Sequence, residues 1–264
     1  MNKKFESFIN KVIIYLHYIY SLYCKYDLFL RIEGIQKIIL DYSQKSGSTG
    51  TKYTTLRLAV KKIQKYKPIY ILECGTGVST IVLGECLLQL KKADPLYTPI
   101  LISMESIEFW YLKAKEILPK EYGDFIHIIF GERKLYEIHM FRGYTHSNIP
   151  KLNYDFIFLD GPGYKDDRGL TCCMDFVYVR EDISDCKVIK GVIDTRVSSV
   201  FICQQLYGLN SVRYLTFLRS SFFKIEKLQV LNSNTPPSKM FKYKFFGKVI
   251  PKMPSLSSIN YLNV

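Results

Sequence analysis

Residues 70–80 read YILECGTGVST. The apolar residues at the start of this segment are typical of a short buried strand, and Gly75 and Gly77 mark a turn that follows it. A helical pattern of apolar residues over 79–92 begins directly after the turn. Glycines between a strand and a helix let a ligand approach the backbone, and the free N–H groups of the helix start favour polar or anionic groups. The segment therefore predicts a binding loop at the carboxyl end of a strand.

The rest of the chain continues this alternation of strands and helices. Strand-like runs occur at 69–72, 99–104, 125–130, 155–159 and 188–193, and helical patterns at 53–65, 79–92, 106–118, 169–182 and 196–207. Such alternation predicts an α/β protein with a parallel sheet and helices on both faces. Two further runs, 213–230 and 241–250, are predicted to be antiparallel strands that complete the sheet.

Acidic residues follow three of the predicted strands. Glu73 stands in the glycine loop, Glu105 ends the second strand, and Asp160 ends the strand of DFIFLDGPG. Open α/β sheets bind ligands at the edge formed by the carboxyl ends of their strands. Position 80 is Thr, so the third glycine of the dinucleotide fingerprint is missing, and the carboxylate of Glu73 would repel a pyrophosphate. The loop therefore favours a smaller nucleoside that carries an ammonium group over NAD.

These motifs resemble those of a known family. The segments ECGTGVST (73–80), Glu105 and FLDGP (158–162) are similar to class I S-adenosylmethionine-dependent methyltransferases, in particular to the bacterial subgroup with E-x-G-x-G-x-S-T and D-G-P motifs. The resemblance covers about residues 52–250. It implies a Rossmann-like three-layer sandwich with a seven-stranded, mostly parallel sheet of order 3-2-1-4-5-7-6, in which strand 7 is antiparallel.

The resemblance also implies a cofactor, S-adenosyl-L-methionine, and the residues that hold it. Glu73, Gly75 and Gly77 would bind the methionine part, Glu105 the ribose, and Glu132 would reach the adenine. Asp160 would lie beside the sulfonium and the acceptor. The full expected binding set is Glu73, Gly75, Gly77, Ser79, Thr80, Glu105, Glu132 and Asp160.

Two residues are the candidates for catalysis. Asp160 would act as a base or orient the acceptor, and Arg168 would bind an anionic acceptor. The alternative for Arg168 is an ion pair with a neighbouring aspartate at the start of a helix. His146, in a predicted loop, is a further candidate for a base.

A metal ion is not expected in the site. Catechol-type relatives hold magnesium with the acid after strand 4 and an Asp-Asn pair after strand 5. Here strand 5 ends Asp194-Thr195-Arg196, so the Asn ligand is missing. Two carboxylates with water could still hold a hard cation, and a surface ion pair between Asp194 and Arg196 is the simpler alternative.

The expected domain organisation has three parts. Residues 1–50 form an N-terminal helical extension, 51–252 the methyltransferase domain, and 253–264 a C-terminal tail. Within the extension, apolar residues from Phe5 to Tyr23 have helical spacing, and SQKSGSTGTK (43–52) is a predicted loop. We expect the first helix to pack on the domain. Peripheral contact with a membrane surface through residues 1–25 is the alternative.

Composition bounds the setting and the partners. The net charge is +13, and residues 1–67 hold 13 basic and 4 acidic residues while residues 201–264 hold nine basic and one acidic. Seven cysteines without a CxxC pair argue against a disulfide framework and favour a cytoplasmic protein. We expect a methyl acceptor that is a small molecule or glycan, with the basic ends favouring an anionic one. Nucleic acid is not expected as the acceptor. A nucleic-acid methyltransferase and an inactive binding or scaffold protein of the same fold remain alternatives.

Overall fold

The structure is a computed structural model that describes residues 3–47, 52–160, 165–166, 169–170, 172–215 and 219–228. The strand predicted at 241–250, the tail at 253–264 and Arg168 lie outside the described residues.

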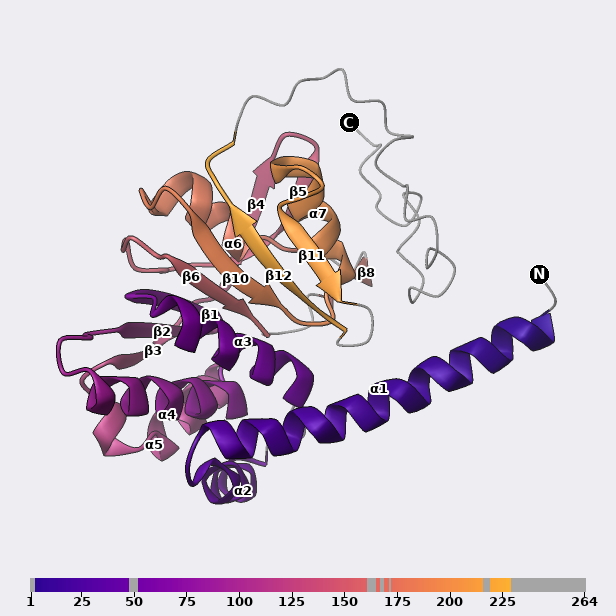
Figure 1. Cartoon of the computed structure of the whole chain (residues 1–264). Helices are drawn as coiled ribbons and strands as arrows, with labels where there is room; N and C mark the ends of the chain where they lie inside the picture. The colour runs from indigo at the N-terminus through magenta and orange to yellow at the C-terminus, as the bar shows by residue number, and fades with distance from the viewer. Residues whose placement is uncertain are drawn as a thin grey trace.

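The centre of the fold is a seven-stranded sheet of order β11-β12-β10-β6-β1-β2-β3 (Figure 1). Its strands are β1 (Tyr70–Cys74), β2 (Ile100–Glu105), β3 (Ile126–Phe130), β6 (Phe156–Leu159), β10 (Ile189–Ile193), β11 (Val212–Leu215) and β12 (Ser220–Ile225). The five from β3 to β10 are parallel, and β12 is antiparallel to both of its neighbours. Counted along the chain within this sheet, the order is 3-2-1-4-5-7-6, which confirms the predicted fold class.

Helices cover both faces of the sheet because successive side chains of a strand point to opposite faces. On β6, Phe156 and Phe158 pack with residues of α2 (Ile35–Ser46), α3 (Tyr53–Tyr66) and α4 (Val78–Ala93). Ile157 and Leu159 belong to the core of the other face, with residues of α6 (Asp175–Tyr178) and α7 (Val197–Tyr207). Helix α5 (Glu108–Ile117) lies against β2 and β3.

The first helix, α1 (Lys3–Arg31), is longer than predicted. Its last turns pack against α3, where Leu28 is fully buried, and Ile32, which directly follows the helix, is buried in the same core. Arg57 of α3 donates to Asp27 at 2.5 Å and to the hydroxyls of Tyr20 and Tyr23. The predicted packing of this helix on the domain therefore holds for its second half.

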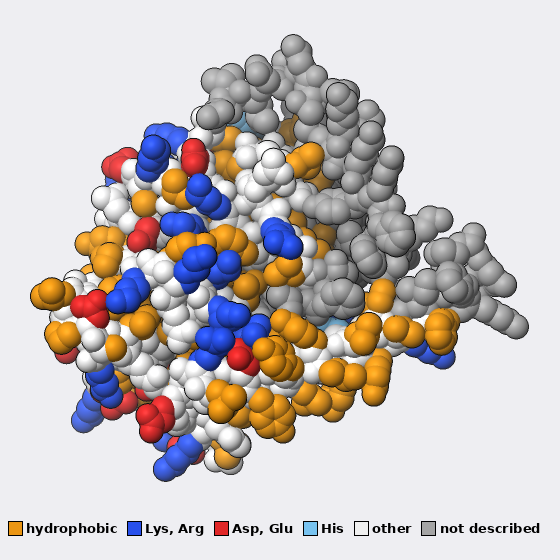
Figure 2. Space-filling model, viewed as in Figure 1, with side chains coloured by type: hydrophobic (Ala, Val, Ile, Leu, Met, Phe, Trp, Pro, Cys, Tyr) orange, Lys and Arg blue, Asp and Glu red, His pale blue; other side chains and the backbone are white. Residues whose placement is uncertain are grey.

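The first half of α1 extends away from the body, and apolar side chains gather along the helix (Figures 1 and 2). The exposed ones are Phe8, Val12, Ile14, Tyr15, Leu16, Tyr18, Ile19, Leu22, Tyr23, Tyr26 and Leu30. Even so, among the described residues no helix combines the length and the apolar character needed to cross a bilayer.

Several predicted elements are wrong in place or type. The predicted helix 169–182 is replaced by strand at 169–170 and 172–173, and α6 begins only at Asp175 and continues as a π-helical turn to Ile183. The predicted strand 213–230 contains most of β11 and all of β12, joined by a short connection, so the hairpin that ends the sheet is complete by Ile225. The predicted loop 43–52 begins only after Ser46.

A second, smaller sheet was not predicted. The strands β4 (Arg133–Ile138) and β5 (Phe141–His146) form an antiparallel hairpin, and β9 (Cys172–Cys173) pairs with β5. This sheet lies on the same side of the main sheet as α6 and α7, since Phe141, Cys172 and Cys173 belong to their core.

Candidate functional site

The carboxyl ends of the parallel strands bring four acidic residues to one edge of the sheet. Glu73 lies in β1 and Glu105 ends β2, while Asp160 and Asp194 directly follow β6 and β10. From β1 the chain proceeds to β2 and β3 in one direction, and β6 and β10 lie on the other side of β1. The order in which strands are added to the sheet therefore reverses between β1 and β6. Open α/β sheets bind ligands in the crevice outside the carboxyl ends of the strands at such a switch point.

The glycine loop between β1 and α4 has the geometry that its sequence predicts. Gly75 adopts a φ of 96°, which side chains other than hydrogen disfavour, and its N–H donates to the carbonyl of Met104 at 2.8 Å. Gly77 caps α4, and its N–H donates to Thr80 Oγ1 at 3.1 Å. A Cβ atom added to Gly77 would meet no atom within 4 Å. The loop thus leaves open space beside its backbone at the start of the helix.

Glu73 is fully buried beneath this loop. Its Oε2 accepts hydrogen bonds from Ser103 Oγ at 2.6 Å and from Thr80 Oγ1 at 2.7 Å. Its Oε1 has no hydrogen-bond partner among the described residues, although the nearby Ser79 hydroxyl lowers the pKa of the carboxyl group. Burial raises the pKa of Glu73 to about 7, against the lowering effect of the hydroxyl donors.

No ion pair neutralises Glu73 within the described part of the chain. A buried carboxylate in that position is costly unless a cation or donor pairs with it, so a ligand with an ammonium group would suit the site.

Glu105 is held rigidly beside the same loop. Its Oε1 accepts the N–H groups of Ser106 at 2.7 Å and Ile107 at 2.9 Å, and its Oε2 accepts the Thr76 hydroxyl at 3.0 Å. The Thr76 N–H also lies 3.4 Å from Oε2, so these donors engage all four lone-pair sites of the carboxylate, and a further hydroxyl donor would have to displace a Thr76 donor. The bond to Thr76 brings the end of β2 and the glycine loop together.

Glu132 follows β3 and is exposed. The loop before it lies next to Glu105, because the N–H of Gly131 donates to the Glu105 carbonyl at 2.9 Å. The structure thus brings Glu73, the glycines, Thr80 and Glu105 into one region, with Glu132 on its rim.

Asp160 and Asp194 stand side by side on the other half of the edge, and a lysine joins them. Lys52 Nζ lies 2.5 Å from Asp194 Oδ2 and 3.4 Å from Asp160 Oδ1, and Arg196 Nη1 lies 2.5 Å from Asp194 Oδ1. Burial raises the pKa of Asp160 to about 6, with a further rise from Asp194 and opposing effects of Lys52 and Arg196. Asp194 and Arg196 do form an ion pair, but the Asp194 side chain is buried. The expectation that this pair lies on the surface is therefore wrong.

Lys52 is a site residue that sequence reasoning missed. It stands just before α3 at the end of a predicted polar loop, where a lysine is ordinarily a solvated residue. Its partners are 108 and 142 residues away along the chain, and no local pattern indicates contacts of that range.

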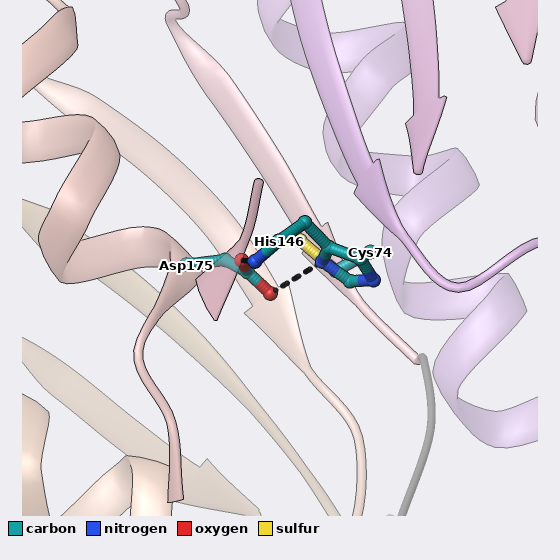
Figure 3. A group of neighbouring side chains, drawn as sticks. All are labelled: Cys74, His146 and Asp175. Atoms are coloured by element: carbon teal, nitrogen blue, oxygen red, sulfur yellow. Dashed lines mark hydrogen bonds and ion pairs between the residues drawn. The ribbon is translucent and has the colours of Figure 1, made fainter. Parts of the chain in front are cut away.

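A second buried cluster lies behind the glycine loop and corrects the prediction for His146. This histidine ends β5, is fully buried, and its Nδ1 lies 3.1 Å from Asp175 Oδ2 (Figure 3). Asp175 also accepts from Thr145 Oγ1 at 2.8 Å, from the His146 N–H at 2.7 Å and from Cys173 Sγ at 3.1 Å. Since His146 is buried in a strand, the prediction that it lies in a loop facing an acceptor is wrong.

This cluster has donor types that metals bind, but its hydrogen bonds favour a structural role. Ligand atoms of Cys74, His146 and Asp175 all lie within 4.8 Å of one another. Burial raises the pKa of the Cys74 thiol well above its usual range, and burial alone would also raise the pKa of Asp175. His146 more than offsets the latter effect, so the pKa of Asp175 is held below its usual range. The two carboxylate oxygens of Asp175 already have four protein partners, so Asp175, His146, Thr145 and Cys173 form a closed hydrogen-bonded cluster.

Comparisons with known proteins give a fold likeness. No protein-family model matches the chain, and no curated protein matches it. One similar solved structure is described as a "putative caffeoyl-CoA O-methyltransferase from Staphylococcus aureus". It is 17% identical, covers 78% of this chain and 100% of its own, and superposes with a TM-score of 0.49. A likeness of that degree says nothing about what this chain binds.

Proposed function

We propose that the chain is an S-adenosylmethionine-dependent methyltransferase that transfers a methyl group to a hydroxyl, amine or carboxylate of a small-molecule or glycan acceptor. The main observation behind this proposal is that two buried carboxylates, Glu73 and Glu105, lie beside an open glycine loop. The loop stands at the point where the strand order of the sheet reverses. Glu73 presents an oxygen without a hydrogen-bond partner in the described structure, and Glu105 lies fixed beside the loop.

The residues present fit the cofactor part by part. Glu73 would pair with the ammonium group of its methionine portion. The loop at Gly75 and Gly77 would let that portion lie close to the backbone. Glu105 would accept the ribose hydroxyls, and the exposed Glu132 would reach the adenine. When bound, the cofactor supplies an electrophilic methyl group on a sulfonium. Ser79 and Thr80 support the site through Glu73, whose carboxyl group both hydroxyls influence.

On the acceptor side, Asp160 is the candidate base. A carboxyl group with a pKa of about 6 ionises just below neutral pH, which suits a group that takes a proton from a hydroxyl or ammonium acceptor. Alignment of acceptor and methyl group supplies much of the remaining rate. Arg168, outside the described residues, stays the predicted contact for an anionic acceptor.

Several further expectations belong to this proposal. The free and mostly buried cysteines fit a cytoplasmic enzyme. The basic ends of the chain would attract an anionic acceptor and favour a small molecule or glycan over nucleic acid. The exposed apolar residues of α1 leave peripheral membrane contact as a further proposal.

Calorimetry with S-adenosylhomocysteine tests the proposal. We expect saturable binding to the wild type, and Glu105→Ala should bind about 1–3 kcal/mol more weakly because two ribose hydroxyls lose their acceptor. Glu108→Ala, an exposed acid three residues further on, is the matched control and should bind like the wild type. Saturable binding of NAD without any response to S-adenosylhomocysteine would overturn the proposal. Binding without methyl transfer to any acceptor would instead favour the scaffold alternative.

A further inference from the structure

Two acids at neighbouring strand ends form a pair that needs a cation. The strands β6 and β10 are parallel with Leu159 opposite Ile193, so Asp160 and Asp194 emerge next to each other at the same edge. The side chain of Asp194 is 1% exposed and that of Asp160 is 18% exposed. Two adjacent carboxylates with little access to water repel each other unless positive charge lies between them. Such a pair can hold a hard divalent cation with oxygen ligands.

In this chain the positive charge comes from side chains. Lys52 Nζ contacts an oxygen of each acid, at 2.5 Å for Asp194 and 3.4 Å for Asp160. The second oxygen of Asp194 forms an ion pair with Arg196 Nη1 at 2.5 Å and accepts a hydrogen bond from the Arg196 backbone N–H at 3.2 Å. Three of the four carboxylate oxygens are therefore engaged by nitrogen donors. The formal charges of the four side chains, two negative and two positive, already sum to zero.

A divalent cation does not fit beside this arrangement. An ion ligated by both acids would lie within a few ångströms of the Lys52 ammonium, and like charges at about 4 Å repel by several kcal/mol at a protein surface. Magnesium would also require carboxylate oxygens that the lysine and arginine occupy. Only displacement of Lys52 would open the pair to a metal.

We propose that the Lys52 ammonium is the resident cation of the acid pair and takes the place of a divalent metal on the acceptor side of the site. The ammonium has three N–H donors, of which the two acids accept two, and the side chain is 43% exposed. Lys52 is therefore a positioning residue that fixes Asp160 and still faces the open side of the edge. If the chain is the proposed methyltransferase, this role of Lys52 implies that methyl transfer needs no divalent metal, and that part of the inference rests on the proposed function.

Manganese binding tests this inference without an acceptor. The free Mn²⁺ signal in electron paramagnetic resonance is followed as protein is added to Mn²⁺ at pH 8, well above the pKa of about 6 of Asp160. We expect wild type and Lys61→Met, the variant of an exposed lysine in α3, to leave the signal unchanged up to about 1 mM protein. Lys52→Met should bind Mn²⁺ at least about tenfold more tightly than wild type, and Asp160→Asn added to Lys52→Met should abolish that gain.

The outcomes separate this inference from the proposed function. Tight Mn²⁺ binding by wild type that a folded Asp160→Asn removes would overturn it. Absence of any gain in a folded Lys52→Met, checked by its thermal melting, would also overturn it. S-adenosylhomocysteine binding is measured on the same samples by calorimetry, where the control Lys61→Met should match wild type. A failure of the proposed function would appear there and leave the manganese result unaffected.

Discussion

The buried carboxyl group of Glu73 should make cofactor binding depend on pH. In the free protein the pKa of Glu73 is about 7, because burial opposes its ionisation. A ligand that brings an ammonium group to this oxygen binds the ionised form. We therefore expect the affinity for S-adenosylhomocysteine to rise as the pH increases from 6 to 8.

The magnitude follows from the fraction of Glu73 that is ionised. With a pKa of about 7, that fraction is about 0.1 at pH 6 and about 0.9 at pH 8, so the dissociation constant should fall about tenfold, or about 1.4 kcal/mol. The ligand's ammonium stays protonated across this range, because an amine of this kind titrates at higher pH. The affinity therefore increases with pH, because Glu73 is the group that loses its proton between pH 6 and pH 8.

Calorimetry at pH 6, 7 and 8 in buffers of different ionisation enthalpy measures both the affinity and the protons released. Wild type should release most of one proton per ligand bound at pH 6 and few at pH 8. Glu73→Gln is the matched variant, since it keeps the shape and lacks the titration. It should bind more weakly at pH 8 and lose the tenfold slope. An affinity of wild type that is constant from pH 6 to 8, or a slope that persists in Glu73→Gln, would refute the reasoning.

Three further predictions concern other parts of the molecule. Removal of residues 1–30 should lower the melting temperature of the remainder, because the buried Leu28 is lost from the core; an unchanged melting temperature with loss of binding to anionic liposomes would favour a membrane contact instead. Asp160→Asn should lower turnover and leave S-adenosylhomocysteine affinity within a few-fold, whereas Arg168→Ala should mainly raise the acceptor KM; steady-state kinetics checks both, and wild-type values would remove either residue from its role. Asp175→Asn should lower the free energy of unfolding in urea by about 2–4 kcal/mol, since the buried donors around it lose a charged acceptor, and a change below about 0.5 kcal/mol would contradict its structural role.

The main sheet and the grouping of Glu73, Glu105 and the glycine loop at one edge could be predicted because their signals are local. A buried strand, a glycine turn and an acid at the next strand end all lie within short segments, and parallel strands bring such ends to one edge. The order of the sheet then followed from the family resemblance, and the structure confirms it. Glu73 and Glu105 lie where these signals place them, beside the loop of Gly75 and Gly77.

The parts that could not be predicted depend on contacts between distant segments. Strand β4 begins with Arg133 and Lys134, has Glu137 next to its last residue and is largely exposed, so the hairpin with β5 shows no clear apolar alternation. Residues 172–173 form a strand because β5 lies beside them, and that neighbour is not visible in their own sequence. His146 has the residue type of a catalytic base, but its burial against Asp175 follows from the same unpredicted hairpin.

The contacts of Lys52 also set an order of events in folding. The ion pairs join residues 108 and 142 positions apart, so they can form only after β6 and β10 have taken their places in the sheet. Contacts of such long range close late, because the entropy of the intervening chain must be lost first. Until then, of the two cations of the cluster, only Arg196 lies close to the aspartates along the chain, two residues after Asp194. We therefore expect the amides at the start of α3 to gain protection from hydrogen exchange later than those of β1 and β2, so that the half of the edge with Asp160 and Asp194 forms after the half that surrounds the glycine loop.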